Sequence, residues 1–244
     1  MTTTTAQDNI LKFLIPKSTV HEMVRLGPPE DGGYVVPQFV LDKCSCLFSY
    51  GIGSEYRAEL EFIERYQKPI YSFDHTVAHW TLPPEINHAP EGLGFGENCN
   101  DFIEHCRQRH IGMGVFVKID VEGQEYEYFL NVDIDCFSDL AIGLCLEVHW
   151  LDHPEIQRHF VDMMKILDRN FILVHTHANN WGEKFTYDGY KIYNVYELTF
   201  LHKRYVKQVA VVTDSYPLQN LDYPNNPHLP DYQFPFFKDE QLVA

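Results

Sequence analysis

Short apolar segments alternate with amphipathic ones through the middle of this chain. The apolar runs predict buried strands at residues 46–50, 69–74, 115–120, 142–148 and 171–175. Segments with apolar residues three or four positions apart predict helices between them, at residues 56–66, 101–109, 124–130 and 155–168. Regular alternation of strands and helices predicts an α/β fold with a mainly parallel sheet.

The two ends of the chain depart from this alternation. A short helix at residues 9–14 precedes a turn-rich stretch with a short strand, and a further strand is expected near residues 86–89. After residue 170 strand follows strand, at 171–175, 195–201 and 209–213, which predicts an antiparallel edge. We expect one domain over residues 1–244. It comprises an N-terminal helix and cap (1–45), a cofactor-binding core (46–213) and a proline-rich, irregular tail (214–244).

Composition narrows the range of partners. The chain has 244 residues, with 19 lysines and arginines against 35 aspartates and glutamates, a formal charge of −16. Such an acidic protein is a poor candidate for binding nucleic acid or an anionic membrane surface. No apolar run approaches the roughly 20 residues that a membrane span needs, and the first residues lack a basic and apolar leader, so we expect a cytoplasmic protein. Six cysteines without a CxxC pair indicate no disulfide framework.

Glycines follow the first strand of the α/β core. Gly51 and Gly53 lie between the strand and the next helix, where backbone can approach a ligand closely. A dinucleotide fingerprint would have a third glycine at the position of Tyr56, and Glu55 would repel a pyrophosphate. The turn therefore favours a cationic or zwitterionic ligand, or is only a tight turn. Asp74 ends the next strand, 21 residues after Gly53, where an acid can accept both hydroxyls of a ribose or cap a helix.

Two acids end the central strand. Asp120 and Glu122 precede Gly123, at the sheet edge where ligands bind in open α/β folds. Neighbouring carboxylates at such an edge are unfavourable unless they bind something or remain solvated, so we expect both to point into a cleft. Glu125 and Glu127 are expected to be solvated residues of the following helix.

These motifs together resemble the FkbM-like family of S-adenosylmethionine-dependent methyltransferases. The most specific part is Lys118-Ile-Asp-Val-Glu-Gly123, and the stretches at 31–36, 147–149 and 175–180 add to a resemblance that covers residues 25–205. It implies a class I methyltransferase (Rossmann-like) fold, a three-layer sandwich around a mainly parallel seven-stranded sheet with an antiparallel edge strand.

The resemblance also implies a cofactor site. Gly51 and Gly53 would lie under the methionine part of S-adenosylmethionine, Glu55 near its ammonium group or nearby backbone, and Asp74 at the ribose. Residues 92–98 would flank the adenine, and Asp120 and Glu122 would complete the site.

Histidines and acids supply candidate catalytic groups. Glu147 and His149 alternate along one strand and face the same way, as do His175 and His177 on another. Methylation of a hydroxyl needs a general base or a metal, because an alcohol is a poor nucleophile. We expect His149 or His177 to be the base, assisted by Asp120 and Glu147. Alternatively, Asp120, Glu147, His149 and His175 bind a divalent metal, or these histidines are hydrogen-bonded structural residues.

The sequence therefore predicts a methyltransferase that uses S-adenosylmethionine to methylate a hydroxyl of a small polar substrate. A sugar, a nucleotide sugar or another glycan precursor is the expected substrate class, and Asn179, Asn180 and Trp181 suit polar recognition. A homo-oligomer is compatible with the sequence. The alternatives are a metal-dependent hydrolase built on the histidines and acids, and a binding module that has the cofactor fold but no activity.

Overall fold

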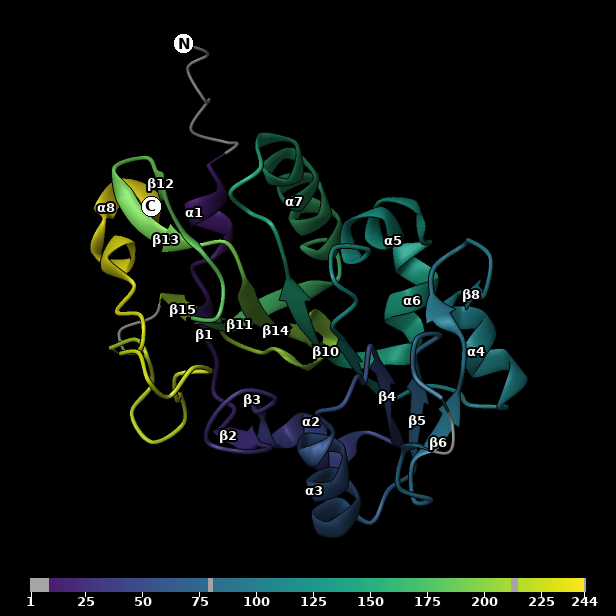
Figure 1. Ribbon diagram of the computed structural model, residues 1–244. Coiled ribbons are helices and arrows are strands. Elements are labelled where there is room, and N and C mark those ends of the chain that lie inside the picture. The colour runs from purple at the N-terminus through teal and green to yellow at the C-terminus, as the bar shows by residue number, and fades with distance from the viewer. Residues whose placement is uncertain (1–8, 79–80, 212–214, 244) are drawn as a thin grey trace.

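A seven-stranded sheet forms the centre of the molecule, in a computed structural model that describes residues 9–78, 81–211 and 215–243. Its strand order is β11-β14-β10-β9-β4-β5-β6 (Figure 1). The strands are β4 (Cys46–Tyr50), β5 (Ile70–Phe73), β6 (Asn87–Ala89), β9 (Val115–Ile119), β10 (Ala141–Val148), β11 (Phe171–Ala178) and β14 (Tyr196–His202). This is the sheet of a class I methyltransferase fold, as the sequence predicts.

One strand runs against the others. β14 pairs antiparallel with both β10 and β11, while β4, β5, β6, β9 and β10 pair in parallel. The predicted antiparallel edge is confirmed, with the reversed strand placed one position inside it. The insertion of β14 separates β10 from β11, so residues at their ends are two strands apart.

Helices cover both faces of the sheet (Figure 1). One face carries α1 (Ile10–Phe13), α4 (Phe102–Gln108), α5 (Glu125–Asn131), α6 (Ile134–Leu140) and α7 (Pro154–Leu167). The other carries α2 (Gln38–Lys43), α3 (Arg57–Tyr66) and the hairpin of β2 (Met23–Leu26) and β3 (Tyr34–Pro37). Strand alternation divides the core accordingly, because Val117 packs toward the first layer and Phe116 toward the second.

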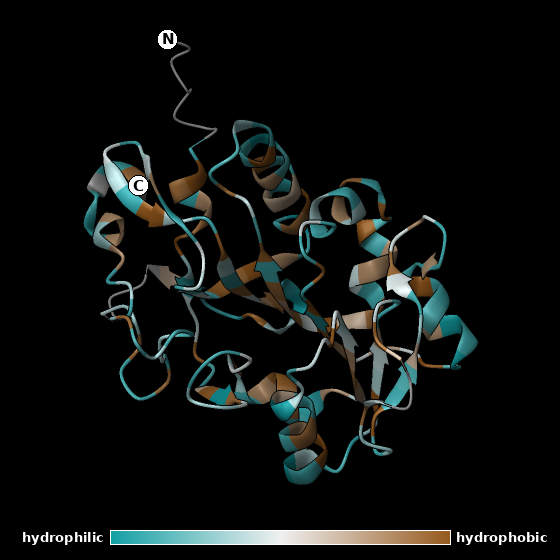
Figure 2. Cartoon of the chain, in the orientation of Figure 1, coloured by the Kyte–Doolittle hydropathy of each residue, from teal (hydrophilic) through white to brown (hydrophobic). Residues whose placement is uncertain are grey.

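The second face changes from apolar to polar along its strands. In β9, Phe116 is followed on this face by Lys118, and in β10, Ile142 and Cys145 are followed by Glu147. Figure 2 shows the strands mostly brown along their length and the tip of β10 in teal. The polar groups therefore gather at the carboxyl ends of the parallel strands, where this fold has its ligand site.

Several elements were not predicted from the sequence. They include α2, α6, β2, and the hairpin of β12 (Lys184–Tyr187) and β13 (Tyr190–Tyr193). Two further strand pairs are β1 (Lys17–Ser18) with β15 (Ala210–Val211) and β7 (Gly92–Leu93) with β8 (Cys99–Asn100). Three short helical elements are η2 (Lys203–Tyr205), η3 (Pro235–Lys238) and α8 (Glu240–Val243). The strand predicted at 209–213 contains β15, which pairs with β1 and not with the main sheet, and residues 212 and 213 lie outside the described residues. The C-terminal tail buries Phe234 and Phe236 in the main core. None of the described helices is long and apolar enough to cross a bilayer.

Candidate functional site

A cavity of about 970 Å³ lies at the carboxyl ends of β4, β5, β9 and β10. That volume is at the upper end of the range for small-molecule sites. Its lining includes every residue predicted for the cofactor, namely Gly51, Gly53, Glu55, Asp74, Asp120 and Glu122, together with Glu147 and His149. Of the adenine segment predicted at 92–98, Gly92 and Leu93 line it.

The two glycines of the turn serve different purposes. A Cβ on Gly51 would lie 1.6 Å from the carbonyl oxygen of Asp120, so glycine is required there by the neighbouring strand. A Cβ on Gly53 would meet no atom within 4 Å and would project into open space, although its φ of +53° disfavours other residues. Gly53 therefore leaves room in the cavity, while Gly51 allows β4 and β9 to approach each other.

Asp74 is held in a fixed orientation at the end of β5. Its Oδ1 accepts hydrogen bonds from the backbone N–H and the hydroxyl of Thr76, at 2.8 and 2.6 Å, and its Oδ2 accepts one from Gly53 N–H at 3.2 Å. Burial alone would raise the pKa of Asp74, but the bonds from Thr76 and Gly53 outweigh it and lower that pKa. The carboxylate is thus ionised and oriented before any ligand binds.

Glu55 lies at the cavity lining but has a partner of its own. Its carboxylate forms an ion pair with Arg57, with a 2.6 Å contact between Oε2 and Nη2. Hydrogen bonds from Arg57 lower the pKa of Glu55. The predicted contact of Glu55 with a ligand ammonium group therefore has to compete with this arginine.

Lys118 is a buried cation beneath the cavity. Its Nζ donates to the carbonyl oxygen of Gly51 at 2.9 Å and lies 3.5 Å from Asp120 Oδ2. Burial lowers the pKa of Lys118, but the negative charges of Asp120, Glu59 and Glu147 outweigh it, so that its pKa is raised. Lys118 therefore stays charged, ties the glycine turn to the end of β9 and orients Asp120.

His149 is a cavity histidine that a buried glutamate holds in place. Its Nδ1 and its backbone N–H both contact Glu125 Oε1, at 3.3 and 3.1 Å, and Glu125 Oε2 accepts from Gly123 N–H at 2.8 Å. Glu125 has no exposed surface, so its prediction as a solvated helix residue is wrong. Burial lowers the pKa of His149, but the hydrogen bond to Glu125 and the neighbouring carboxylates raise it above its ordinary value.

Glu147 is a buried carboxyl group beside this imidazole. Asn179 donates to its Oε1 at 3.0 Å, and the same oxygen lies 3.7 Å from His149 Nε2. Burial is the largest cause of a pKa raised well above the ordinary value of a glutamate, and the charges of Asp120, Glu197 and Asp31 add to it.

His175 and His177 do not share this cavity. His175 Nε2 lies 3.0 Å from Asp222 Oδ1, and His177 lies between Glu197 and Asp231, at 3.2 and 3.1 Å. Neither histidine lines the cavity, so the expectation that one of them faces it together with His149 is wrong, as is the inclusion of His175 in a metal site with Asp120. Because β14 lies between β10 and β11, these histidines are two strands away from Glu147.

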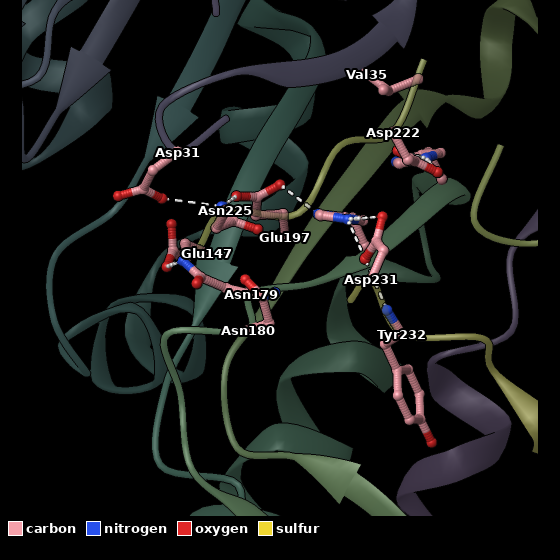
Figure 3. Close-up of polar contacts among 12 residues, drawn as sticks. Asp31, Val35, Glu147, Asn179, Asn180, Glu197, Asp222, Asn225, Asp231 and Tyr232 are labelled. Carbon is pink, nitrogen blue, oxygen red and sulfur yellow. Dashed lines mark hydrogen bonds and ion pairs between the residues drawn. The ribbon is translucent and has the colours of Figure 1, made fainter. Parts of the chain in front are cut away.

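The two histidines instead hold the tail against the sheet. Asp222 and Asp231 both belong to the C-terminal tail, and Asn225 joins Glu197 to Asp31 with bonds of 2.6 and 2.9 Å (Figure 3). Asn180 exchanges two hydrogen bonds with the backbone of Asn226, so this predicted substrate contact also has a structural partner. The polar network thus reaches from β11 to Asp31, which lines the cavity.

Two tryptophans also line the cavity. Trp150 and Trp181 are 46% and 59% exposed, and they follow β10 and β11. Trp150 has a left-handed φ of +62°, which directs the chain away from β10 immediately after His149. Trp150 was not predicted, although the pattern of an aromatic residue directly after a strand-end histidine could have indicated it.

Comparison with known proteins adds the following. No family model matches the sequence, and no curated protein shows significant similarity. Similar solved structures include the fibrillarin pre-rRNA processing protein of Methanococcus jannaschii, at 9% identity over 76% of this chain and 87% of that chain, with a TM-score of 0.41. A putative tRNA (m1A22) methyltransferase of Streptococcus pneumoniae bound to S-adenosyl-L-methionine is similar at 13% identity over 73% and 76%, with a TM-score of 0.37. Likenesses this distant carry no argument about activity or substrate, which must come from the site itself.

Proposed function

We propose that this protein is a methyltransferase that uses S-adenosylmethionine to methylate a hydroxyl group of an uncharged polar substrate. The observation that carries the proposal is the oriented carboxylate of Asp74 beside the open turn at Gly53, both on one cavity at the carboxyl edge of a class I methyltransferase sheet. The resemblance of the Lys118–Gly123 stretch to FkbM-like methyltransferases supports the same assignment.

The residues present fit this cofactor. Asp74 would accept hydrogen bonds from the two ribose hydroxyls, and the space beside Gly53 would hold the methionine part. Gly92 and Leu93 lie on the β5 side of the cavity, where the adenine would follow the ribose. When bound, the cofactor supplies an electrophilic methyl group on its sulfonium, and the chain orients the acceptor hydroxyl in line with it.

The charge of the cavity limits the substrate. Eight carboxylates line it: Asp31, Glu55, Asp74, Asp120, Glu122, Glu147, Asp152 and Glu183. Lys118 is the one lysine or arginine among the described residues of that lining, and it is already bonded to Gly51. A phosphorylated acceptor would be repelled by this field, so the site favours a neutral sugar over the nucleotide sugar considered from the sequence.

The tryptophans fit the same substrate class. The exposed rings of Trp150 and Trp181 offer flat apolar surfaces, and the surrounding carboxylates accept hydrogen bonds from hydroxyl groups. Glu147 is placed to act as general base because it lies in the cavity at the end of β10, 3.7 Å from the Nε2 nitrogen of His149, the residue that follows the strand. His177 is outside the cavity and contributes to the fold instead.

Calorimetry with S-adenosylhomocysteine tests the cofactor assignment. We expect saturable binding to the full chain that the Asp74→Ala variant weakens. Transfer of a radiolabelled methyl group to neutral and phosphorylated sugars then tests the substrate class, with label expected on neutral sugars.

The two alternative functions predict other outcomes. A binding module would bind the cofactor product and show no transfer to any hydroxyl compound. A metal-dependent hydrolase would not bind S-adenosylhomocysteine at all, and that result would refute the proposed methyltransferase.

A further inference from the structure

Three carboxylates surround one nitrogen of His149. Its Nε2 lies 3.7 Å from Asp120 Oδ1, 3.6 Å from Glu122 Oε2 and 3.7 Å from Glu147 Oε1. These separations are longer than hydrogen bonds. One ligand atom each from Asp120, Glu122 and His149 also lies within 4.8 Å of the other two. Asp120, Glu122 and His149 therefore surround a common point without a hydrogen bond between them there, and Glu147 lies beside the same nitrogen.

The spacing matches that of atoms around a metal ion. Bonds of about 2.0–2.2 Å from a metal to histidine nitrogen or carboxylate oxygen place two ligands about 3.3–3.6 Å apart in a tetrahedron. The same bonds place neighbouring ligands about 2.8–3.1 Å apart in an octahedron. The 3.6 Å from Glu122 lies at the upper end of the tetrahedral range and the 3.7 Å from Asp120 just beyond it, so binding requires the ligands to contract by up to about 0.4 Å.

His149 presents an unpartnered nitrogen to this point. Its side chain is only 6% exposed, and within the described part of the chain no hydrogen bond reaches Nε2. Because Nδ1 bonds to the Glu125 carboxylate, the proton of a neutral imidazole belongs on Nδ1 and the lone pair of Nε2 points at the carboxylates. Three anionic oxygens around Nε2 require a positive charge at this point, either a proton on Nε2 or a metal ion that replaces it.

Further groups orient the side chains from behind. Lys118 lies 3.5 Å from the other oxygen of Asp120, Glu125 holds the imidazole, and Asn179 donates to Glu147. Carboxylate–histidine–metal arrangements with such outer partners are typical of metal sites, where the outer partners fix the tautomer and ligand direction.

We propose that Asp120, Glu122 and His149 bind a divalent cation, with Glu147 close to the histidine ligand. The mixed oxygen and nitrogen donors suit Mn²⁺ or Zn²⁺ better than Ca²⁺. The proposal that an ion binds here is based on this geometry and does not depend on the proposed function. The ion's role, lowering the pKa of an acceptor hydroxyl, rests on the proposed methyltransferase function.

In that role the hydroxyl oxygen of the acceptor forms the new bond to the methyl carbon as the bond from that carbon to sulfur breaks. The electron pair of the broken bond stays on sulfur, which becomes a neutral thioether, and the hydroxyl proton passes to Glu147. Methyl ether, S-adenosylhomocysteine and one proton are the products, so no further reactant is needed.

Titration of the EDTA-treated full chain with MnCl₂ tests the site. Binding is detected as the loss of the free Mn²⁺ signal in electron paramagnetic resonance spectra and, separately, by calorimetry. We expect one Mn²⁺ per chain. The variants D120N, E122Q and H149A should weaken binding at least about 10-fold, and E125Q, which removes an outer partner, about 10–100-fold. Glu183 is another exposed acid of the same cavity, so E183Q is the matched control and should bind as wild type does.

Three results would overturn the site. The first is that the folded wild type shows no saturable binding of Mn²⁺, Zn²⁺ or Mg²⁺. The second is that E122Q and H149A bind the ion with wild-type affinity. The third is that E122Q and E183Q lose the same amount of affinity, which would indicate nonspecific attraction by the acidic cavity. Because Glu122 is 78% exposed, E122Q remains informative even if H149A fails to fold. Binding of S-adenosylhomocysteine is measured on the same samples, so that metal binding without cofactor binding refutes only the proposed function.

Discussion

Replacing His177 should change how the stability of this protein depends on pH. His177 is 2% exposed and lies between Glu197 and Asp231, at 3.2 and 3.1 Å. Burial lowers its pKa, but the hydrogen bonds to Asp231 and Glu197 outweigh burial and raise the pKa to about 10. The protein therefore contains a buried imidazolium between two carboxylates at neutral pH.

The size of the effect follows from linkage. The folded-state pKa of about 10 lies above the unfolded value of about 6.5, so the stabilisation is complete below pH 6.5 and is lost as the pH rises toward 10. Between pH 6.5 and 8.5 this amounts to about 2 kcal/mol of lost unfolding free energy. His177→Gln removes the cation and leaves two acids without it, which lowers the unfolding free energy by about 3–5 kcal/mol at pH 6.5. The unfolding free energy of the variant should not fall further between pH 6.5 and 8.5 through this group.

Urea unfolding of wild type and His177→Gln at pH 6.5, 7.5 and 8.5 measures both effects. The buried thiols, whose pKa values are raised, to about 12 for Cys145, begin to ionise in the unfolded chain near pH 8.5 and add a loss that wild type and variant share, so the comparison between the two isolates His177. His228 is an exposed histidine of the same tail, and His228→Gln should behave as wild type. A pH dependence in His177→Gln equal to that of wild type would refute the assignment of a buried imidazolium.

Other consequences concern the cavity. Asp74→Asn should weaken S-adenosylhomocysteine binding by about 1–3 kcal/mol in calorimetry, since charge-assisted acceptor bonds are lost; unchanged affinity would remove Asp74 from the ribose site. Gly53→Val should abolish that binding, because its side chain enters the cavity at a φ of +53°, and a folded variant with normal affinity would contradict this. The double variant Trp150→Ala/Trp181→Ala should raise the KM for a neutral acceptor with little change in cofactor affinity, as steady-state kinetics would show. Glu147→Gln should lower kcat about 10²–10⁴-fold, and a wild-type kcat in that variant would exclude it as the base.

Local pattern was sufficient to predict the strands of the core and the acids at their ends. Asp74 and Asp120 each follow a short apolar run, and parallel strands bring their carboxyl ends to one edge. The cavity at that edge includes both residues together with Gly53. The cofactor-site residues were predicted from their positions at strand ends and from the family resemblance, and the structure places all of them on one cavity. Their roles there remain predictions.

Only the tertiary structure determined which histidines belong to the cavity. Alternation along a strand places Glu147 and His149 on one face, and likewise His175 and His177. It does not tell which strands are neighbours in the sheet. Strands lie about 4.8 Å apart, so the insertion of β14 moves β11 about 10 Å from β10. Glu125 shows the same limit, because its bonds to Gly123 and to His149 after β10 accompany the burial of a residue that was assigned to solvent from the sequence. Sequence thus determined the chemistry at each strand end, while strand order and helix packing determined which of those groups meet.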